Sequence, residues 1–180
     1  MRPTETLMRE HQIILAVLDA AAREVQRMQE TGEVRMERLE QMVDFFRNFA
    51  DRCHHAKEEK LLFVRMEERG MSREAGPIGV MLYEHDLGRG YVRAVAEALP
   101  RAGNDPAARQ AVQENLAQYI QLLRDHIYKE DYILYPMADQ LLLPEDQRAL
   151  EEAFERVERE EIGEGVHEKY HELAHRLAEE

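Results

Sequence analysis

Apolar residues recur along the chain at alternating steps of three and four residues, which is the spacing of one buried face of a helix. Turn-forming residues gather at five places and separate long segments: Thr31-Gly32, 69–77, 100–106, Leu143-Pro144 and 163–165. Strand-like alternation is absent, and residues of high helix propensity dominate. We therefore expect an all-α protein, with an antiparallel up-down-up-down four-helix bundle in residues 1–142 and an additional C-terminal helical segment, residues 143–180, packed on it.

Each of the four expected bundle helices carries a histidine within its apolar seam. The first two seams are Leu7, His11, Ile14, Leu18, Ala21, Val25 and Met28, and Met36, Leu39, Val43, Phe46, Ala50, His54, Glu58 and Leu61. The other two are Ile78, Met81, His85, Gly88, Val92, Val95 and Leu99, and Val112, Leu116, Tyr119, Leu123, His126, Glu130, Ile133 and Met137. Four histidines and two glutamates thus face the predicted core.

These six polar residues are arranged as an internal repeat. The pair Glu10-His11 on the first helix matches Glu84-His85 on the third, and HHAKEEKLLF from position 54 matches HIYKEDYILY from position 126. An H-x-x-x-E pattern places both side chains on one helix face, roughly 6 Å apart. Each half of the chain therefore offers two histidines and one glutamate to a shared point in the core.

Burial of Glu58 and Glu130 as bare anions would be unfavourable by several kcal/mol each, which a bound cation would offset. Four imidazoles and two carboxylates suffice for two metal ions, with two histidines on each and the carboxylates bridging. Nitrogen and oxygen ligands without a thiolate suit iron, manganese or zinc, and open positions favour iron. A lone histidine in a seam is usually a packed core residue. A purely structural bundle therefore remains the simpler alternative, and it predicts no bound metal.

Composition limits the classes of partner. The 180 residues include 24 Lys and Arg against 37 Asp and Glu, which gives a net charge of −13. Nucleic acid and anionic membranes are therefore not expected as partners. The single cysteine, Cys53, forms no internal disulfide, no segment has the length of a membrane span, and the first residues lack a targeting pattern, so we expect a cytoplasmic location. The oligomeric state is not indicated.

Three segments resemble the hemerythrin-like HHE cation-binding proteins: HHAKEEKLLF (54–63), GPIGVMLYEHD (76–86) and HIYKEDYILYP (126–136). The resemblance covers roughly residues 5–140. It implies a four-helix bundle with a non-haem di-iron site. The ligands that carry over are His11, His54, Glu58, His85, His126 and Glu130. Of the two adjacent histidines His54 is the ligand by register, and His55 is expected beside the site or facing outward.

One departure from the oxygen-carrying hemerythrins bears on function. Those carriers have a second histidine one turn along the third helix and an aspartate on the fourth, where this chain has Arg89 and Glu130. The arrangement looks more like the branch tied to iron–sulfur repair under nitrosative stress, or to iron and oxygen sensing. We expect a protein that binds or senses a small gaseous ligand, O2 or NO, or handles iron. The alternative is a di-iron enzyme with peroxidase or NO-detoxifying activity.

The tail contains a second metal-binding pattern, H-E-x-x-H twice, built from His167, His171 and His175. This spacing can chelate zinc in a metalloprotease. However, no third ligand follows, and the tail has its own apolar seam of Val166, Tyr170, Leu173 and Leu177. We expect a helix that packs on the bundle through that seam, and treat the zinc metalloprotease as the weaker alternative.

Overall fold

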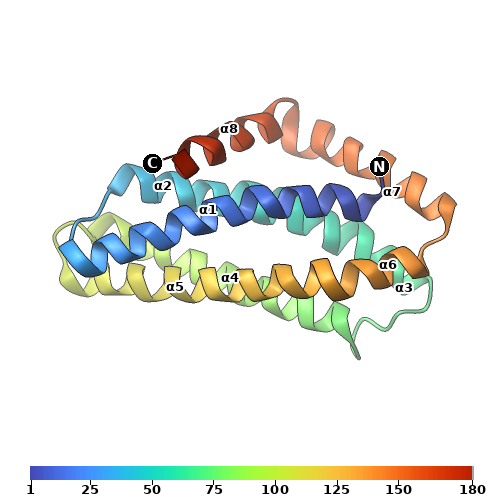
Figure 1. The fold of residues 1–180 in the computed structure, drawn as a ribbon, viewed down its shortest axis with the longest axis horizontal. Helices are drawn as coiled ribbons and strands as arrows, with labels where there is room; N and C mark the ends of the chain where they lie inside the picture. The colour runs from blue at the N-terminus through green and yellow to red at the C-terminus, as the bar shows by residue number, and fades with distance from the viewer. Residues whose placement is uncertain (180) are drawn as a thin grey trace.

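The computed structural model describes residues 1–179, and no strand occurs within them. Figure 1 shows long helices lying alongside one another. The all-α expectation is confirmed. The helices are α1 (Pro3–Thr31), α2 (Met36–Phe45), α3 (Phe63–Glu68), α4 (Pro77–Ala98), α5 (Pro106–Lys129), α6 (Tyr135–Leu141), α7 (Pro144–Arg156) and α8 (Val166–Glu179).

Several connections between these helices are themselves helical. The π-helical segments η1 (Phe46–His55) and η2 (Glu58–Leu62) join α2 to α3, and η4 (Glu130–Leu134) joins α5 to α6. A further π-helical segment, η5 (Val157–Gly163), follows α7, and the 3-10 turn η3 (Leu99–Arg101) ends α4. Residues 36–68 and 106–141 are therefore two long rods, each carrying one H-x-x-x-E pattern.

The long helices contact one another in a closed arrangement. Helix α4 packs on α5, α1 packs on α5 and α2, and α2 also contacts α4. The tail lies along α1 and α2, with α7 and α8 both touching α1 (Figure 1). The apolar side of α8 faces the core at Tyr170, Leu173 and Leu177, each no more than 5% exposed. The tail helix therefore packs on the other helices through this seam.

Local signals explain where the helices start and stop. The Asp105 side chain accepts a hydrogen bond from the N–H of Ala107 at 3.0 Å and caps α5, which begins with Pro106. Gly32 ends α1 with a φ of 73°, a left-handed conformation that a residue with a Cβ rarely adopts. Pro77 similarly starts α4. These signals set where α1 ends and where α4 and α5 begin.

The polar residues divide the apolar core into two clusters. One cluster holds Ile14, Leu18, Phe46 and Leu123 on one side of the histidine level. The other holds Leu7, Phe63, Met81 and Leu134 on the other side. The histidines and glutamates therefore form a polar layer with packed hydrophobic side chains above and below, which limits the access of water to it.

Beyond the two glutamates the buried face is displaced by one residue from the expected seam. The N–H of Phe63 bonds to the carbonyl of Glu58 and that of Tyr135 to the carbonyl of Glu130, five residues back in both cases. A π turn of this kind adds one residue to the helix and rotates the residues beyond the turn about the helix axis. The seam prediction was consequently wrong for Ile133 and Met137, which are 51% and 38% exposed. The core positions beyond the turns are instead Leu62, Phe63, Met66, Leu134, Tyr135 and Ala138.

No helix within residues 1–179 is both long enough and apolar enough to cross a bilayer.

Candidate metal centre

The six residues predicted from the sequence lie together in the polar layer. Every one of them is at most 1% exposed. They come from four different helical stretches: His11 from α1, His54 and Glu58 from the first rod, His85 from α4, and His126 and Glu130 from the second rod.

The glutamates lie between histidines of different helices. Oε1 of Glu58 is 3.4 Å from Nε2 of His54 and 3.5 Å from Nε2 of His85. Oε1 of Glu130 is 3.3 Å from Nε2 of His11 and 3.0 Å from Nε2 of His126. Each carboxylate therefore contacts one histidine from each half of the repeat.

The other ring nitrogen of each histidine is held by a carboxylate outside the layer. Nδ1 of His11 lies 2.6 Å from Asp131, and Nδ1 of His85 lies 2.6 Å from Glu59. The corresponding contacts are His54 to Glu10 at 2.9 Å and His126 to Glu84 at 3.2 Å. An Nδ1–H that donates to a carboxylate leaves Nε2 with a free lone pair, and this is how proteins orient histidines toward metals. All four Nε2 atoms face inward.

The outer carboxylates follow the sequence repeat. Glu10 and Glu84 directly precede the histidines of the first and third helices, and each holds the histidine of a neighbouring rod. Nζ of Lys57 lies 2.6 Å from Glu10, and Nζ of Lys129 lies 2.5 Å from Glu84. Sequence reasoning found the repeat but gave these residues no role. Their repetition in both halves was the signal that could have found them.

Buried oxygen atoms without partners show that a cation fits this site. Oε1 of Glu58 and both carboxylate oxygens of Glu130 are buried and have no hydrogen-bond partner among the described residues. Burial, and then the neighbouring Glu58 carboxylate, raise the pKa of Glu130 well above its usual range. Two adjacent buried carboxylates resist simultaneous ionisation, and a cation between them removes that penalty.

The histidine pKa values show the same excess of negative charge. Burial acts to lower the pKa of His54, but hydrogen bonds to Glu10 and Glu58 outweigh it and raise the pKa to about 9. The pKa of His11 is also raised, because bonds to Asp131 and Glu130 exceed the effect of burial. Without a metal these rings take up protons, so the protonated histidines and a metal ion compete for the same acceptors.

The described residues contain three groups of possible metal ligands: Glu10, Cys53 and Glu158 form one outside the polar layer, and the other two lie within it. His11, His54 and Glu130 form one, and His55, Glu58, His85 and His126 form the other. Each of these two groups contains two of the predicted histidines. Glu58 and Glu130 each contact one histidine of both groups. The residues present fit two metal ions with bridging carboxylates.

His55 lies beside the centre, which was one of the two positions expected for it. Its ring is 4% exposed and stacks on the His85 ring, with centroids 3.8 Å apart. Burial, followed by the nearby His85, lowers the pKa of His55 well below its usual range. His55 is therefore a neutral ring next to the second group.

One tyrosine that sequence reasoning missed touches the centre. The hydroxyl of Tyr135 donates to Oε2 of Glu58 at 3.1 Å and lies 3.4 Å from Nε2 of His11. The π turn at Glu130 rotates Tyr135 inward, which the expected seam could not anticipate. Two other tyrosines close in sequence to these residues, Tyr83 and Tyr128, are 65% and 61% exposed.

The tail forms no separate histidine metal site in residues 1–179, although its Glu158 belongs to one group of possible ligands. None of its histidines belongs to a group of possible metal ligands there. His171 is exposed, and His175 pairs with Glu179 at the surface. His167 instead reaches the main centre indirectly, because its Nε2 lies 3.5 Å from Glu10, the residue that holds His54. The tail also supplies Glu158 to Lys57.

The comparisons with known proteins agree with this geometry. The family model of the hemerythrin HHE cation binding domain matches residues 2–138. This chain belongs to that family. The resemblance noted in the sequence is confirmed.

Several curated proteins are similar to the chain. An uncharacterised protein of Mycobacterium tuberculosis (strain H37Rv) is 26% identical over 161 residues, covering 89% of this chain and 62% of that protein. The chain therefore spans less than two thirds of the length of these relatives. The iron-sulfur cluster repair protein YtfE of Musicola paradisiaca is 37% identical over 90 residues, 47% of this chain and 40% of that protein. The YtfE protein of Salmonella schwarzengrund is 35% identical over 89 residues, again 47% of this chain and 40% of that protein.

Proposed function

We propose that this hemerythrin-family protein holds two iron ions and binds a small gaseous ligand, O2 or NO, at that centre. One observation carries the proposal. Four buried Nε2 atoms face two glutamates that keep three carboxylate oxygens without a hydrogen-bond partner, while every Nδ1 is held by an outer carboxylate. In this proposal the metal-binding part is an antiparallel four-helix bundle of residues 1–142, and residues 143–180 are an extension packed on it.

The chain's own residues have distinct roles in this proposal. His11 and His54 would hold one ion, His85 and His126 would hold the other, and Glu58 and Glu130 would supply carboxylate oxygens to them. Bound iron would supply the redox and ligand-binding chemistry toward O2 or NO. Asp131, Glu10, Glu59 and Glu84 keep the Nδ1 protons in place, and the apolar clusters on both sides keep bulk water out.

A role in iron–sulfur repair is supported by the YtfE relatives, which are named for that activity. The match extends over less than half of either chain, so this role belongs to the proposal. Arg89 also fits it, because it occupies the position of an additional histidine ligand in the oxygen carriers. The Arg89 side chain donates to Asp51 and Glu59 rather than facing the metal site as a ligand would.

The proposal is tested on protein purified without an affinity tag and loaded anaerobically with Fe(II). We expect about two irons per chain, and a new visible absorption band and an altered EPR signal when NO or O2 is added. His54→Ala should lose both the iron and the band. His171→Ala, a change at an exposed tail histidine, should keep them and serves as the control.

Two results would contradict the proposal. If His54→Ala and the parent protein had the same iron content, the proposed iron site would be wrong. If NO and O2 left the spectra unchanged, the proposed gas binding would be wrong. Sustained consumption of peroxide or NO by the loaded protein would instead favour the enzyme alternative.

A further inference from the structure

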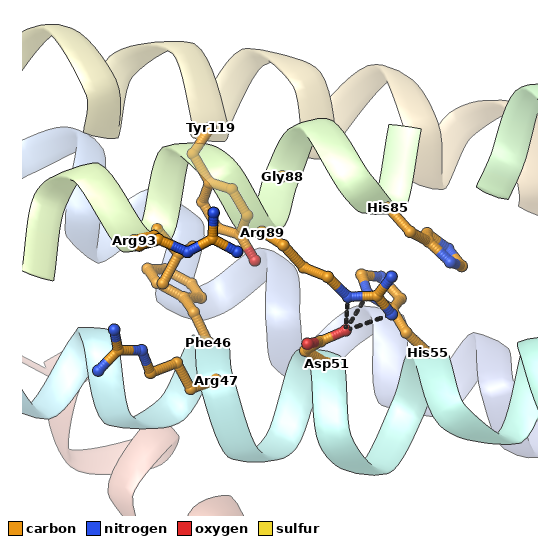
Figure 2. A pocket seen from close by; sticks show the side chains of 10 residues that line it. Phe46, Arg47, Asp51, His55, His85, Gly88, Arg89, Arg93 and Tyr119 are labelled. Carbon is orange, nitrogen blue, oxygen red and sulfur yellow. Dashed lines mark hydrogen bonds and ion pairs between the residues drawn. The ribbon is translucent and has the colours of Figure 1, made fainter. Parts of the chain in front are cut away.

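A pocket opens beside the metal centre, between η1 and α4. Its volume is about 190 Å³, and His55 and His85 are among its lining residues. Figure 2 shows these two histidines at one end and Arg47 and Arg93 at the other. The pocket therefore connects the protein surface with the His85 side of the centre.

The pocket concentrates positive charge in an acidic protein. Arg47, Arg89 and Arg93 line it together with a single carboxylate, Asp51, although the whole chain has a net charge of −13. Arg89 is already neutralised, because it donates to Asp51, Glu59 and Asp86.

The other two arginines are placed differently. Arg47 and Arg93 are exposed and have no ion pair or hydrogen bond within residues 1–179. Their donors are therefore available at the outer end of the pocket, where they would attract anions.

A buried tyrosine whose hydroxyl reaches the pocket provides a second, independent sign of a ligand. Tyr119 is only 2% exposed, and its hydroxyl has no hydrogen-bond partner in the described part of the chain. Figure 2 shows this hydroxyl directed toward the space near Arg89 and Arg93. The hydroxyl lines the open pocket, and a polar ligand there would accept a hydrogen bond from it. The ring is held in place, because it packs against Phe46 with centroids 4.8 Å apart.

The internal repeat shows that this pocket belongs to one half only. Aligning the Glu-His pairs places Gly88 and Arg89 opposite Ile14 and Leu15, and aligning the rods places Asp51 opposite Leu123. Ile14 and Leu123 are buried in the apolar core, and Leu15 packs against it. Asp51 and Arg89 therefore have no polar counterpart in the other half of the repeat.

We propose that this pocket binds a small inorganic oxyanion such as nitrite, between Arg47, Arg93 and the Tyr119 hydroxyl. The cavity is smaller than the roughly 300–1,000 Å³ typical of sites for drug-sized organic ligands, which favours an inorganic ion. Arginine donors and a phenol hydroxyl are suited to the oxygens of such an anion. The site goes beyond the proposed gas-binding function and does not require iron.

The test is calorimetric titration of sodium nitrite into the full chain, both iron-loaded and chelator-treated, at constant ionic strength. We expect saturable binding of one nitrite per chain in both forms. Arg93→Gln should weaken it about tenfold, through the loss of a charge-assisted hydrogen bond. Tyr119→Phe should weaken it by a smaller factor of about three to five.

Arg148→Gln is the matched control, since Arg148 is a solvent-facing arginine on α7 and the change alters the net charge equally. Nitrite affinity should be unchanged in this variant. Three results would overturn the proposal. The first is an equal change of nitrite affinity in Arg93→Gln and Arg148→Gln, and the second is binding that does not saturate. The third is binding that occurs only with iron and has the same affinity in Arg93→Gln. The last would make nitrite a metal ligand alone. Because the chelator-treated arm contains no iron, failure of the gas-binding proposal leaves this test intact.

Discussion

Glu10 holds His54 from a neighbouring helix, with Oε1 of the carboxylate 2.9 Å from Nδ1 of the ring. This contact decides which nitrogen of His54 faces Glu58, because a ring that donates from Nδ1 presents a lone pair at Nε2. The same relationship links Glu84 to His126 in the other half. The orientation of the histidines in the polar layer thus depends on Glu10 and Glu84, which lie outside the layer.

Glu10→Gln should weaken metal binding by about 10- to 100-fold, since changes in the residues that orient metal-bound histidines have effects of this size. The substituted amide keeps the shape of the side chain but removes the charge that stabilises the Nδ1–H. Chelator competition with iron or zinc measures the affinity. Glu172→Gln, at an exposed position in α8, is the control. Equal affinities in the two variants would show that Glu10 does not orient His54.

Lys57→Met should destabilise the fold more than Lys129→Met, although the two lysines are equivalent in the repeat. The Lys57 side chain is 0% exposed and pairs with Glu10 and Glu158, whereas that of Lys129 is 38% exposed. Removing one partner of a buried pair costs about 3–5 kcal/mol, and an exposed pair contributes about 1 kcal/mol or less. Urea unfolding measures the difference. If both variants lost the same free energy of unfolding, the contact between Lys57 and Glu158 of the tail would not stabilise the fold as expected.

The metal-free protein should lose stability as pH rises from about 6.5 to about 9. The folded-state pKa of His54 is raised to about 9 from 6.5, so its contribution is complete below the lower value and disappears as pH passes the higher one. His11 and His85 have raised pKa values and act in the same direction. The lowered pKa of His55 acts below pH 6.5, outside this range.

Thermal unfolding of chelator-treated protein across this pH range measures the effect. In metal-loaded protein the slope should be absent or reversed, because metal binding requires the unprotonated Nε2 atoms and releases their protons. A metal-free melting temperature that rises between about pH 6.5 and 9 would contradict the assigned histidine environments.

Tyr135→Phe should leave the fold nearly intact, with a loss of about 1 kcal/mol for one hydrogen bond. Its effect should appear at the metal, because the hydroxyl donates to Glu58 and lies next to Nε2 of His11. We expect a shifted absorption band in the iron-loaded protein. The control is Tyr132→Phe, which changes a tyrosine that is 70% exposed. Identical spectra for both variants would exclude a role for Tyr135 at the centre.

Periodicity predicted the helices and the polar layer because both follow from local spacing along the chain. His54 could be chosen over His55 for the same reason, since only His54 lies one turn before Glu58. The π turns at Glu58 and Glu130 were not predictable in this way, because a backbone bond to the fifth residue leaves no signature in residue type. The π turn at Glu130 explains both the errors at Ile133 and Met137 and the failure to find Tyr135.

Tertiary contacts account for what else was missed. Spacing did not predict the burial of Lys57, which is 0% exposed because the tail brings Glu158 to its ammonium group. The pocket at Arg89 and Tyr119 likewise depends on how η1 and α4 face each other. Such contacts join residues far apart in the chain, and spacing alone does not reveal them.

Anomalous X-ray diffraction at the iron edge, on crystals of untagged, iron-loaded protein, would test the proposed two-iron centre without relying on spectra or variants. We expect two anomalous peaks within the polar layer, one between His11 and His54 and one between His85 and His126, with Glu58 and Glu130 bridging them. A single peak, no peak in the layer, or peaks only at the tail histidines His171 and His175 would contradict the two-iron centre.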